Sequence, residues 1–298
     1  MSLRRYVQLD VFASRPGAGN PLAVVLDAEG LDDGAMQAIA RWTRLPETTF
    51  VLLPDKFPAQ SDDASYWIRI FSPRREVPFA GHPSVGTAHV LLDAGLVKPR
   101  EGLLMQDGIA GKLPLQVNGE GTQRTVAVRT PRARVQEIAD ADDARLRRAL
   151  TGLRLGALPP VLMDGGRRWW LAELASEEEL RNATPDWAAI VQLAGDTDSM
   201  GLFVYARSDD PVYHYAVRAF VGAPAQFEDA ASGAANATLA AWLAESDALP
   251  DGNGLYRVSQ GREVGHDAII ELQVDDQGEV WSGGRAVAVV SGTLDWPN

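Results

Sequence analysis

Hydrophobic and polar residues alternate over several short segments of this chain. Val7, Leu9 and Val11 are separated by polar neighbours, which is typical of a β-strand with one buried face. By the same reasoning we expect further strands at residues 22–26, 48–53, 66–71, 201–207, 212–220, 255–259, 268–274 and 286–291. Strands therefore run through both halves of the chain.

Three segments between these strands have the pattern of helices. Met36 and Ala40 lie at helical spacing behind aspartates that can cap a helix. A second helix is predicted from about Ser84 to Leu92, ending near Gly95, a residue type that suits the left-handed position after a helix. A third, apolar helix is predicted from about Gly233 to Leu243. The pattern indicates a mixed α/β protein.

The two halves of the chain share a local pattern. A strand containing Arg-x-Phe occurs at Arg69 and again at Arg218, and after each a glycine opens an apolar helix. If the recurrence is not due to chance, it predicts a pseudo-symmetric pair of domains whose helix N-termini share a cleft. The polar, Gly-rich segment 117–124 is the best candidate boundary, so we expect domains at residues 1–118 and 119–284.

Composition narrows the possible functions. With 46% hydrophobic and 23% charged residues, the chain has the make-up of an ordinary globular protein. The absence of cysteine excludes disulfide scaffolds, thiolate metal sites, cysteine nucleophiles and two-thiol racemases. The net charge of −12 argues against nucleic acid as a partner. We find no signal-peptide pattern or membrane-length apolar run, so we expect a cytoplasmic protein without a membrane partner.

Nucleotide and metal motifs are incomplete. The stretch from Gly17 to Pro21 lacks the third glycine of a dinucleotide fingerprint, and Gly81-x-x-x-x-Gly86 lacks the lysine of a phosphate-binding loop. None of the four histidines has metal-binding spacing, and His89 has the apolar neighbours of a core histidine. We expect neither a cofactor nor a metal.

Three residues stand where a functional side chain could lie, and each has a structural alternative. His82 follows Gly81 at a helix N-terminus, where an anion could bind, but it could also be a cap or a packing residue. Glu47, at a strand entry, is either a surface residue or a proton carrier whose pKa is raised in an apolar mouth. Asp229 precedes the second apolar helix as a cap would, unless Ser232 caps that helix and leaves Asp229 for other work.

A wider set of motifs resembles the phenazine-biosynthesis PhzF-like family, with matching order and spacing over essentially the whole chain. The residues that carry this resemblance are Gly19-Asn-Pro-Leu-Ala-Val-Val, Pro46-Glu-Thr-Thr-Phe, Arg69-Ile-Phe-Ser-Pro, Glu76-Val-Pro-Phe-Ala-Gly-His-Pro-Ser-Val-Gly and Glu228-Asp-Ala-Ala-Ser-Gly-Ala-Ala. The resemblance implies an α+β fold of two pseudo-symmetric diaminopimelate epimerase-like domains. Each is a β-sheet wrapped around a central helix, with the active site between them. It also implies that the last strand, within residues 285–298, returns to the first domain.

The resemblance further implies a cofactor-independent isomerase, and members of this family are often homodimers. Glu47 would be the acid/base, and His82 and Asp229 would contact the substrate. The other substrate-binding residues would lie at the two helix N-termini, namely Gly81, Ser232, Gly233 and Ala234. We therefore expect proton transfer on a small carboxylated, amino-acid-like molecule.

The chain departs from the family pattern beside the second helix. Ala230 and Ala234 stand where the family usually has proline and a substrate-contacting serine, and Gly265-His266-Asp267 replaces a common Gly-Arg. A lost hydroxyl removes a hydrogen bond worth about 1 kcal/mol, which argues against the phenazine precursor itself as substrate.

Two alternative functions stay open. One is an epimerase or racemase in which Asp229 or His82 acts opposite Glu47, and the other is a non-catalytic binder of small acidic metabolites.

Overall fold

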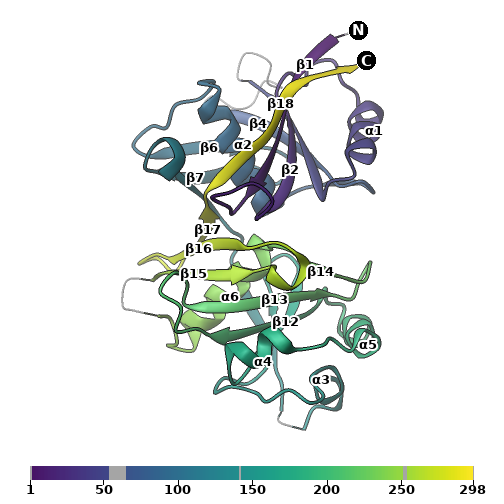
Figure 1. Ribbon diagram of the computed structural model, residues 1–298, viewed down its shortest axis with the longest axis vertical. Coiled ribbons are helices and arrows are strands. Elements are labelled where there is room, and N and C mark those ends of the chain that lie inside the picture. Colours follow the sequence, from purple (N-terminus) through teal and green to yellow (C-terminus); the bar gives the residue numbers. More distant parts are fainter. Residues whose placement is uncertain (1, 54–64, 141, 251–253, 298) are drawn as a thin grey trace. The chain divides into compact units, whose positions relative to one another are not determined.

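The computed structural model describes residues 2–53, 65–140, 142–250 and 254–297, and the chain forms two compact units (Figure 1). Unit 1 comprises Met1–Arg129 and Gly283–Asn298, and unit 2 comprises Thr130–Ser282. The division lies at residues 129/130, not at the expected 118/119. The reason is that the Gly-rich segment forms the turn of a hairpin whose two strands both belong to unit 1.

Unit 1 is built on a mixed β-sheet. Its strands are β1 (Ser2–Val11), β2 (Asn20–Val25), β3 (Glu47–Leu52), β4 (Tyr66–Phe71), β5 (Glu76–Val77), β6 (Leu103–Asp107), β7 (Leu113–Asn118), β8 (Thr125–Arg129) and β18 (Ala286–Trp296). The order across the sheet is β18–β1–β2–β3–β4–β6–β7–β8, with β5 also paired to β4. Only the β2–β3 and β4–β6 pairs among these are parallel. Each is joined through a helix, as a parallel connection requires: α1 (Asp33–Thr43) and α2 (Gly81–Asp93).

Helix α2 is the central helix of unit 1. Its residues from Gly81 to Leu91 are all buried, and it contacts β1, β2, β3, β8 and β18. A helix that is covered on all sides has no polar face, which explains why its sequence lacks the stripe of a surface helix. At Gly86, a Cβ atom would lie 2.6 Å from side-chain carbons of Val11 and Leu22. The glycine therefore lets α2 approach the sheet closely.

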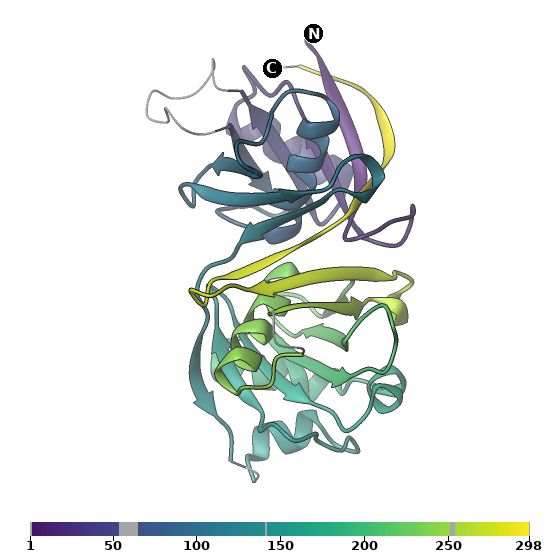
Figure 2. The ribbon, with the colours of Figure 1, turned by 90° about the vertical axis from the view of Figure 1, so that its left-hand side faces the viewer.

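Unit 2 contains a second mixed sheet. Its strands are β9 (Arg134–Ile138), β10 (Val161–Asp164), β11 (Arg168–Glu173), β12 (Gly201–Arg207), β13 (Tyr215–Val221), β14 (Phe227–Asp229), β15 (Leu255–Gln260) and β16 (Ala268–Val274), and β17 (Val280–Gly284) crosses the division between the units. Its helices are α3 (Ala144–Ala149), α4 (Glu177–Asn182), α5 (Trp187–Thr197) and α6 (Gly233–Glu245). Short 3-10 turns occur at η2 (Gly121–Gln123) in unit 1 and η3 (Arg262–Val264) in unit 2. Helix α6 packs against β9, β10, β11 and β16 (Figure 2).

The same order of strand pairing occurs in both units. In unit 2 the order is β9–β10–β11–β12–β13–β15–β16, with β14 also paired to β13. The parallel pairs are β11–β12 and β13–β15, which correspond to β2–β3 and β4–β6 of unit 1. Helix α6 occupies the position of α2 in this order, since each lies between a short return strand and the strand parallel to the Arg-x-Phe strand.

The strands expected from alternation are present with small shifts at their ends. The largest changes are at 212–220, where β13 spans Tyr215–Val221, and at 286–291, where β18 continues to Trp296. The helix expected from Ser84 begins three residues earlier, at Gly81. Proline at the third helical position does not prevent this, because first-turn N–H groups have no partner within the helix.

Candidate active site

In unit 1 the structure brings Glu47 and His82 together. Glu47 is the first residue of β3, and His82 is the second residue of α2. The distance from Glu47 Oε2 to His82 Nε2 is 3.4 Å, and the two side chains are 19% and 8% exposed. The alternative that His82 caps the helix was wrong, since Ala80 is the N-cap residue and α2 has no side-chain capping bond.

The imidazole of His82 is neutral, and its tautomer is fixed. Burial lowers the pKa of His82 to about 3, against the opposing effect of a hydrogen bond with the backbone of Pro21. Proline offers only a carbonyl oxygen, so the ring must donate to it. Nε2 makes no hydrogen bond with a described residue, which makes Nδ1 the donor. In a neutral ring the other nitrogen then carries a lone pair, and this lone pair is on Nε2, the atom nearest Glu47.

The Gly-Asn-Pro motif positions that carbonyl. Asn20 and Pro21 begin β2, where Asn20 is paired with Val11 of β1. A Cβ atom on Gly19 would lie 2.2 Å from the carbonyl oxygen of Val11, so only glycine permits this approach. The motif therefore contributes to the site through its backbone.

In unit 2 the predicted residues gather where β14 meets α6. Asp229 ends β14, and Ser232 is the N-cap of α6, its hydroxyl accepting from Ala235 N at 3.3 Å. Of the two caps considered, the structure uses Ser232. The carboxylate of Asp229 instead accepts from Ala231 N at 3.2 Å. Gly233 and Ala234 are the first two residues of the helix.

The surroundings of Asp229 act on it in opposite directions. Burial raises the pKa of Asp229, while the N–H of Ala231 and the charges of Arg167 and His266 lower it. Arg167 lies in the β10–β11 turn and is exposed. The next residue, Arg168, forms ion pairs with Asp164 and Asp198.

A pair of strands that was not predicted from the sequence as part of the site precedes each helix N-terminus and forms a scaffold for it. In β4, Arg69 lies 5.1 Å from the ring of Phe71 and forms a two-pronged ion pair with Glu76 of β5. In β13, Arg218 lies 4.8 Å from the ring of Phe220 and pairs in the same way with Glu228 of β14. The phenylalanine and glutamate are opposite each other in both strand pairs, and the helix begins five residues after the glutamate in each unit. That common spacing was the signal available in the sequence.

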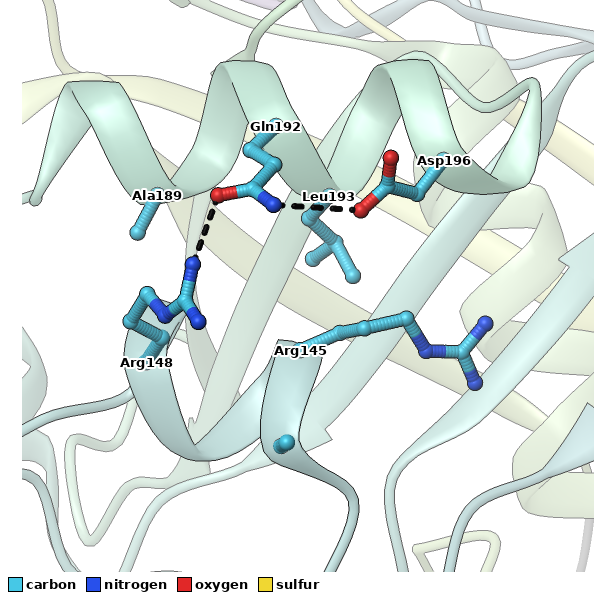
Figure 3. A pocket seen from close by; sticks show the side chains of 7 residues that line it. Arg145, Arg148, Ala189, Gln192, Leu193 and Asp196 are labelled. Atoms are coloured by element: carbon cyan, nitrogen blue, oxygen red, sulfur yellow. Dashed lines mark hydrogen bonds between the residues drawn. The ribbon is translucent and has the colours of Figure 1, made fainter.

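A hollow lies between α3 and α5 of unit 2 (Figure 3), but none of the predicted site residues lines it. Arg148 donates to Gln192 at 2.7 Å, and Arg145 is paired with Glu137 and Asp143. The basic side chains that line this hollow thus already have neighbouring partners.

Over the described part of the chain, no three His, Asp or Glu side chains form a group that could hold a metal ion. No helix in those same segments is long and apolar enough to cross a membrane.

His89 has the environment expected of a core residue. Its Nε2 is 3.1 Å from the carbonyl oxygen of Gly284, and burial lowers the pKa of His89 to about 4. The histidine is 3% exposed and belongs to the interior of unit 1 rather than to the site.

Comparison with known proteins gives matches over nearly the whole chain. The family model described as phenazine biosynthesis-like protein matches residues 9–292. The antisense-enhancing sequence 1 protein of Schizosaccharomyces pombe is 30% identical, covering 98% of this chain and 99% of its own. The trans-2,3-dihydro-3-hydroxyanthranilate isomerase of Pseudomonas aeruginosa is 33% identical, covering 93% and 92%.

Solved structures agree at the level of the fold. The PhzF-family phenazine biosynthesis protein of Bacillus anthracis superimposes with a TM-score of 0.82 over 99% of each chain, at 24% identity. The likeness shows a shared α+β fold.

Proposed function

This chain belongs to the phenazine biosynthesis-like protein family, and we propose that it is an isomerase that moves a proton on a small carboxylated, amino-acid-like substrate without a cofactor. The observation that carries the proposal is the contact between Glu47 and the neutral His82 in unit 1. The relative from P. aeruginosa, named trans-2,3-dihydro-3-hydroxyanthranilate isomerase, supports the reaction class.

Glu47 is proposed to carry the proton. A carboxylate oxygen opposite the lone pair of His82 Nε2 would place two acceptors 3.4 Å apart. A proton on Glu47 Oε2 turns this contact into a hydrogen bond, and release of that proton to a substrate carbon returns the carboxylate. Glu47 then takes a proton from another carbon, or from the same one, and the cycle closes without any net change in the protein.

The helix N-termini are proposed to bind the substrate's polar groups. The first-turn N–H groups of α2 and α6 have no partner within their helices and carry partial positive charge, which suits a carboxylate. Gly81 and His82 present them in unit 1, and Gly233 and Ala234 in unit 2. Asp229 is proposed to orient an amine, and Ser232 to hold the start of α6. Because Ala234 adds no hydroxyl, the first turn of α6 is proposed to contact the substrate through its backbone N–H groups.

We infer in addition that both units are diaminopimelate epimerase-like and pseudo-symmetric, which the shared pairing order and the repeated ion pair support. The resemblance to PhzF-like proteins also supports a cytoplasmic homodimer acting on a free small molecule.

The epimerase alternative requires two groups on opposite faces of one carbon. His82 does not suit that role beside Glu47, since atoms 3.4 Å apart leave no room for a carbon between them. An epimerase would therefore have to use Asp229 as the second acid/base group. An isomerase needs only one residue that carries the proton.

The test is turnover of a panel of amino acids and cyclic amino-carboxylates, including trans-2,3-dihydro-3-hydroxyanthranilate. Ultraviolet absorbance follows a double-bond shift, and chiral chromatography follows inversion. We expect a double-bond shift with at least one cyclic compound, abolished in Glu47→Gln and retained in the exposed control Glu120→Gln. Inversion without a shift would support the epimerase, and tight binding without turnover of any compound would contradict both enzyme proposals.

A further inference from the structure

Gln260, the last residue of β15, is a fully buried side chain whose amide is used at both ends. Its Oε1 accepts from Ser232 N at 3.1 Å and from Asn236 Nδ2 at 2.8 Å. Its Nε2 donates to the carbonyl oxygen of Asp229 at 2.9 Å. One side chain thus connects the end of β14, the helix cap and the first turn of α6.

The backbone next to Gln260 also fits this segment closely. Gly261 has a φ of +91°, and a Cβ atom there would lie 2.3 Å from the carbonyl oxygen of Ala230. Asn236 extends the network, since its Nδ2 also donates to the carbonyl oxygen of Ser232 at 2.8 Å. The segment from Asp229 to Ser232 is therefore bound to the end of β15 along its length.

Unit 1 has a glutamine in the corresponding strand, but its hydrogen bonds join different elements. Gln106 of β6 donates to Ser84 Oγ at 3.1 Å and accepts from the hydroxyl of Tyr66 at 3.4 Å. Ser84 is the fourth residue of α2, as Asn236 is of α6. These two bonds join Gln106 to α2 and β4 rather than to the segment before α2, and the proposed acid of unit 1, Glu47, lies on a separate strand.

We propose that Gln260 is a positioning residue that fixes Asp229 and the N-terminus of α6 for substrate binding. The inference rests on the proposed function, because it assigns Gln260 a role through Asp229. Loss of the amide leaves two buried donors and one buried acceptor without their partner, which frees the segment to move. Substrate binding should suffer more than the proton transfer itself, since Glu47 belongs to the other unit.

The first experiment measures the segment without any substrate. Amide hydrogen exchange is followed in the full-length protein, in Gln260→Met and in Ser259→Ala. Ser259 is the preceding residue of the same strand, is also fully buried, and gives up one hydrogen bond from Arg181 when it becomes alanine. We expect faster exchange at residues 229–236 in Gln260→Met alone. Equal exchange in Gln260→Met and the parent would overturn the proposal.

The second experiment uses the substrate found in the panel. Gln260→Met should lower kcat/KM by about 10- to 100-fold, chiefly through a higher KM, while Ser259→Ala stays near the parent value. Gln260→Glu adds a pH readout, because a protonated carboxyl keeps all three contacts and an ionised one loses the donor to Asp229. Its activity relative to the parent should rise as the pH falls, whereas the ratio for Gln260→Met should be flat.

The two proposals fail in distinguishable ways. If no protein turns over any compound, the proposed function fails, and the exchange experiment still decides whether Gln260 holds the segment. If the parent is active and Gln260→Met shows faster exchange with unchanged KM and kcat, the positioning role is wrong while the proposed function stands.

Discussion

The N-termini of α2 and α6 rest on the same scaffold but present different chemistry. Both follow an arginine–glutamate pair and a short return strand, and both are bonded at the fourth helical residue by a buried glutamine. The second helical residue is His82 in unit 1 and Ala234 in unit 2. The acid comes from a neighbouring strand in unit 1, as Glu47, and from the return strand itself in unit 2, as Asp229.

The comparison distinguishes the residues that support a helix N-terminus from the residues that could take part in the reaction. A scaffold that recurs in both units has the role of presenting a helix N-terminus, which any anionic group can use. The groups that differ are those that can carry a proton, and in unit 1 an acid, Glu47, lies against the neutral imidazole of His82. This contrast supports our proposal that unit 1 carries the proton-transfer residue and that unit 2 orients the substrate.

The largest expected effect concerns the repeated ion pair. Side chains of Arg218 and Glu228 are 5% and 7% exposed, whereas those of Arg69 and Glu76 are 22% and 24% exposed. Glu228→Gln should lower the free energy of unfolding by about 3–5 kcal/mol, because a buried guanidinium loses its hydrogen-bonded carboxylate and retains Glu263 at 4.0 Å. Glu76→Gln should cost on the order of 1 kcal/mol, since Arg69 keeps Asp33 and is more exposed. Urea titration measures both, and equal losses would show that burial does not distinguish the two pairs.

The two helix N-termini should also respond to pH with opposite sign. His82 has a pKa of about 3 in the folded protein against 6.5 for the free side chain, so the unfolded state binds more protons between these values. Stability contributed by neutral His82 is therefore gained as the pH rises from 3 to 6.5, by about 1.4 kcal/mol per pH unit. His82→Gln should flatten the pH dependence of unfolding over this range, with the remaining slope due to groups such as His89. An unchanged slope would show that His82 is not buried as a neutral ring.

The two helices also differ at the N-cap, because α6 has a side-chain cap and α2 has none. Ser232→Ala should lower the free energy of unfolding by about 1 kcal/mol, because the N–H of Ala235 loses its acceptor. The matched change, Ala80→Ser, supplies a cap that α2 lacks and should stabilise by a similar or smaller amount, since Ala80 already has extended backbone angles. Thermal unfolding of both variants measures the effects, and destabilisation by Ala80→Ser would contradict this view of α2.

The smallest effect is expected at Asp229. Its pKa is raised by burial, so the folded protein binds more protons than the unfolded one above the ordinary value of 3.8. Its contribution to stability therefore falls as the pH rises through the raised pKa, which is opposite to the effect of His82. Asp229→Asn should give a modest gain in melting temperature at pH 7 and none at pH 3, and a loss at pH 7 would mean that the charge is stabilised.

Much of this arrangement was open to prediction from the sequence. Alternation predicts most strands, and the Arg-x-Phe repeat at Arg69 and Arg218 marks corresponding strands of the two units. Glu47 and His82 were named separately, but their contact depends on the parallel pairing of β2 with β3 and on where α2 begins. Such long-range register is set by tertiary packing, which local periodicity does not contain.

Two further features, the role of Gln260 and the place of segment 117–124, also depend on long-range pairing that the sequence does not show. Gln260 stands 31 residues after Asp229, and no motif joins a glutamine at a strand end to a distant carbonyl. The Gly-rich segment 117–124 has the composition of a linker, yet the pairing of β7 with β8 makes it a hairpin turn. Composition alone does not tell a turn within a unit from a connection between units.

The most direct test of the proposed role of Glu47 is solvent exchange at the substrate's reacting carbon. The substrate is incubated in deuterated water with the parent protein, with Glu47→Gln and with Glu120→Gln, and deuterium uptake is followed by mass spectrometry. We predict that the parent and Glu120→Gln incorporate deuterium at equal rates, and that Glu47→Gln is slower by about 100- to 10,000-fold, the usual contribution of a general acid/base. Exchange by Glu47→Gln at the parent rate would show that Glu47 is not the residue that moves the proton.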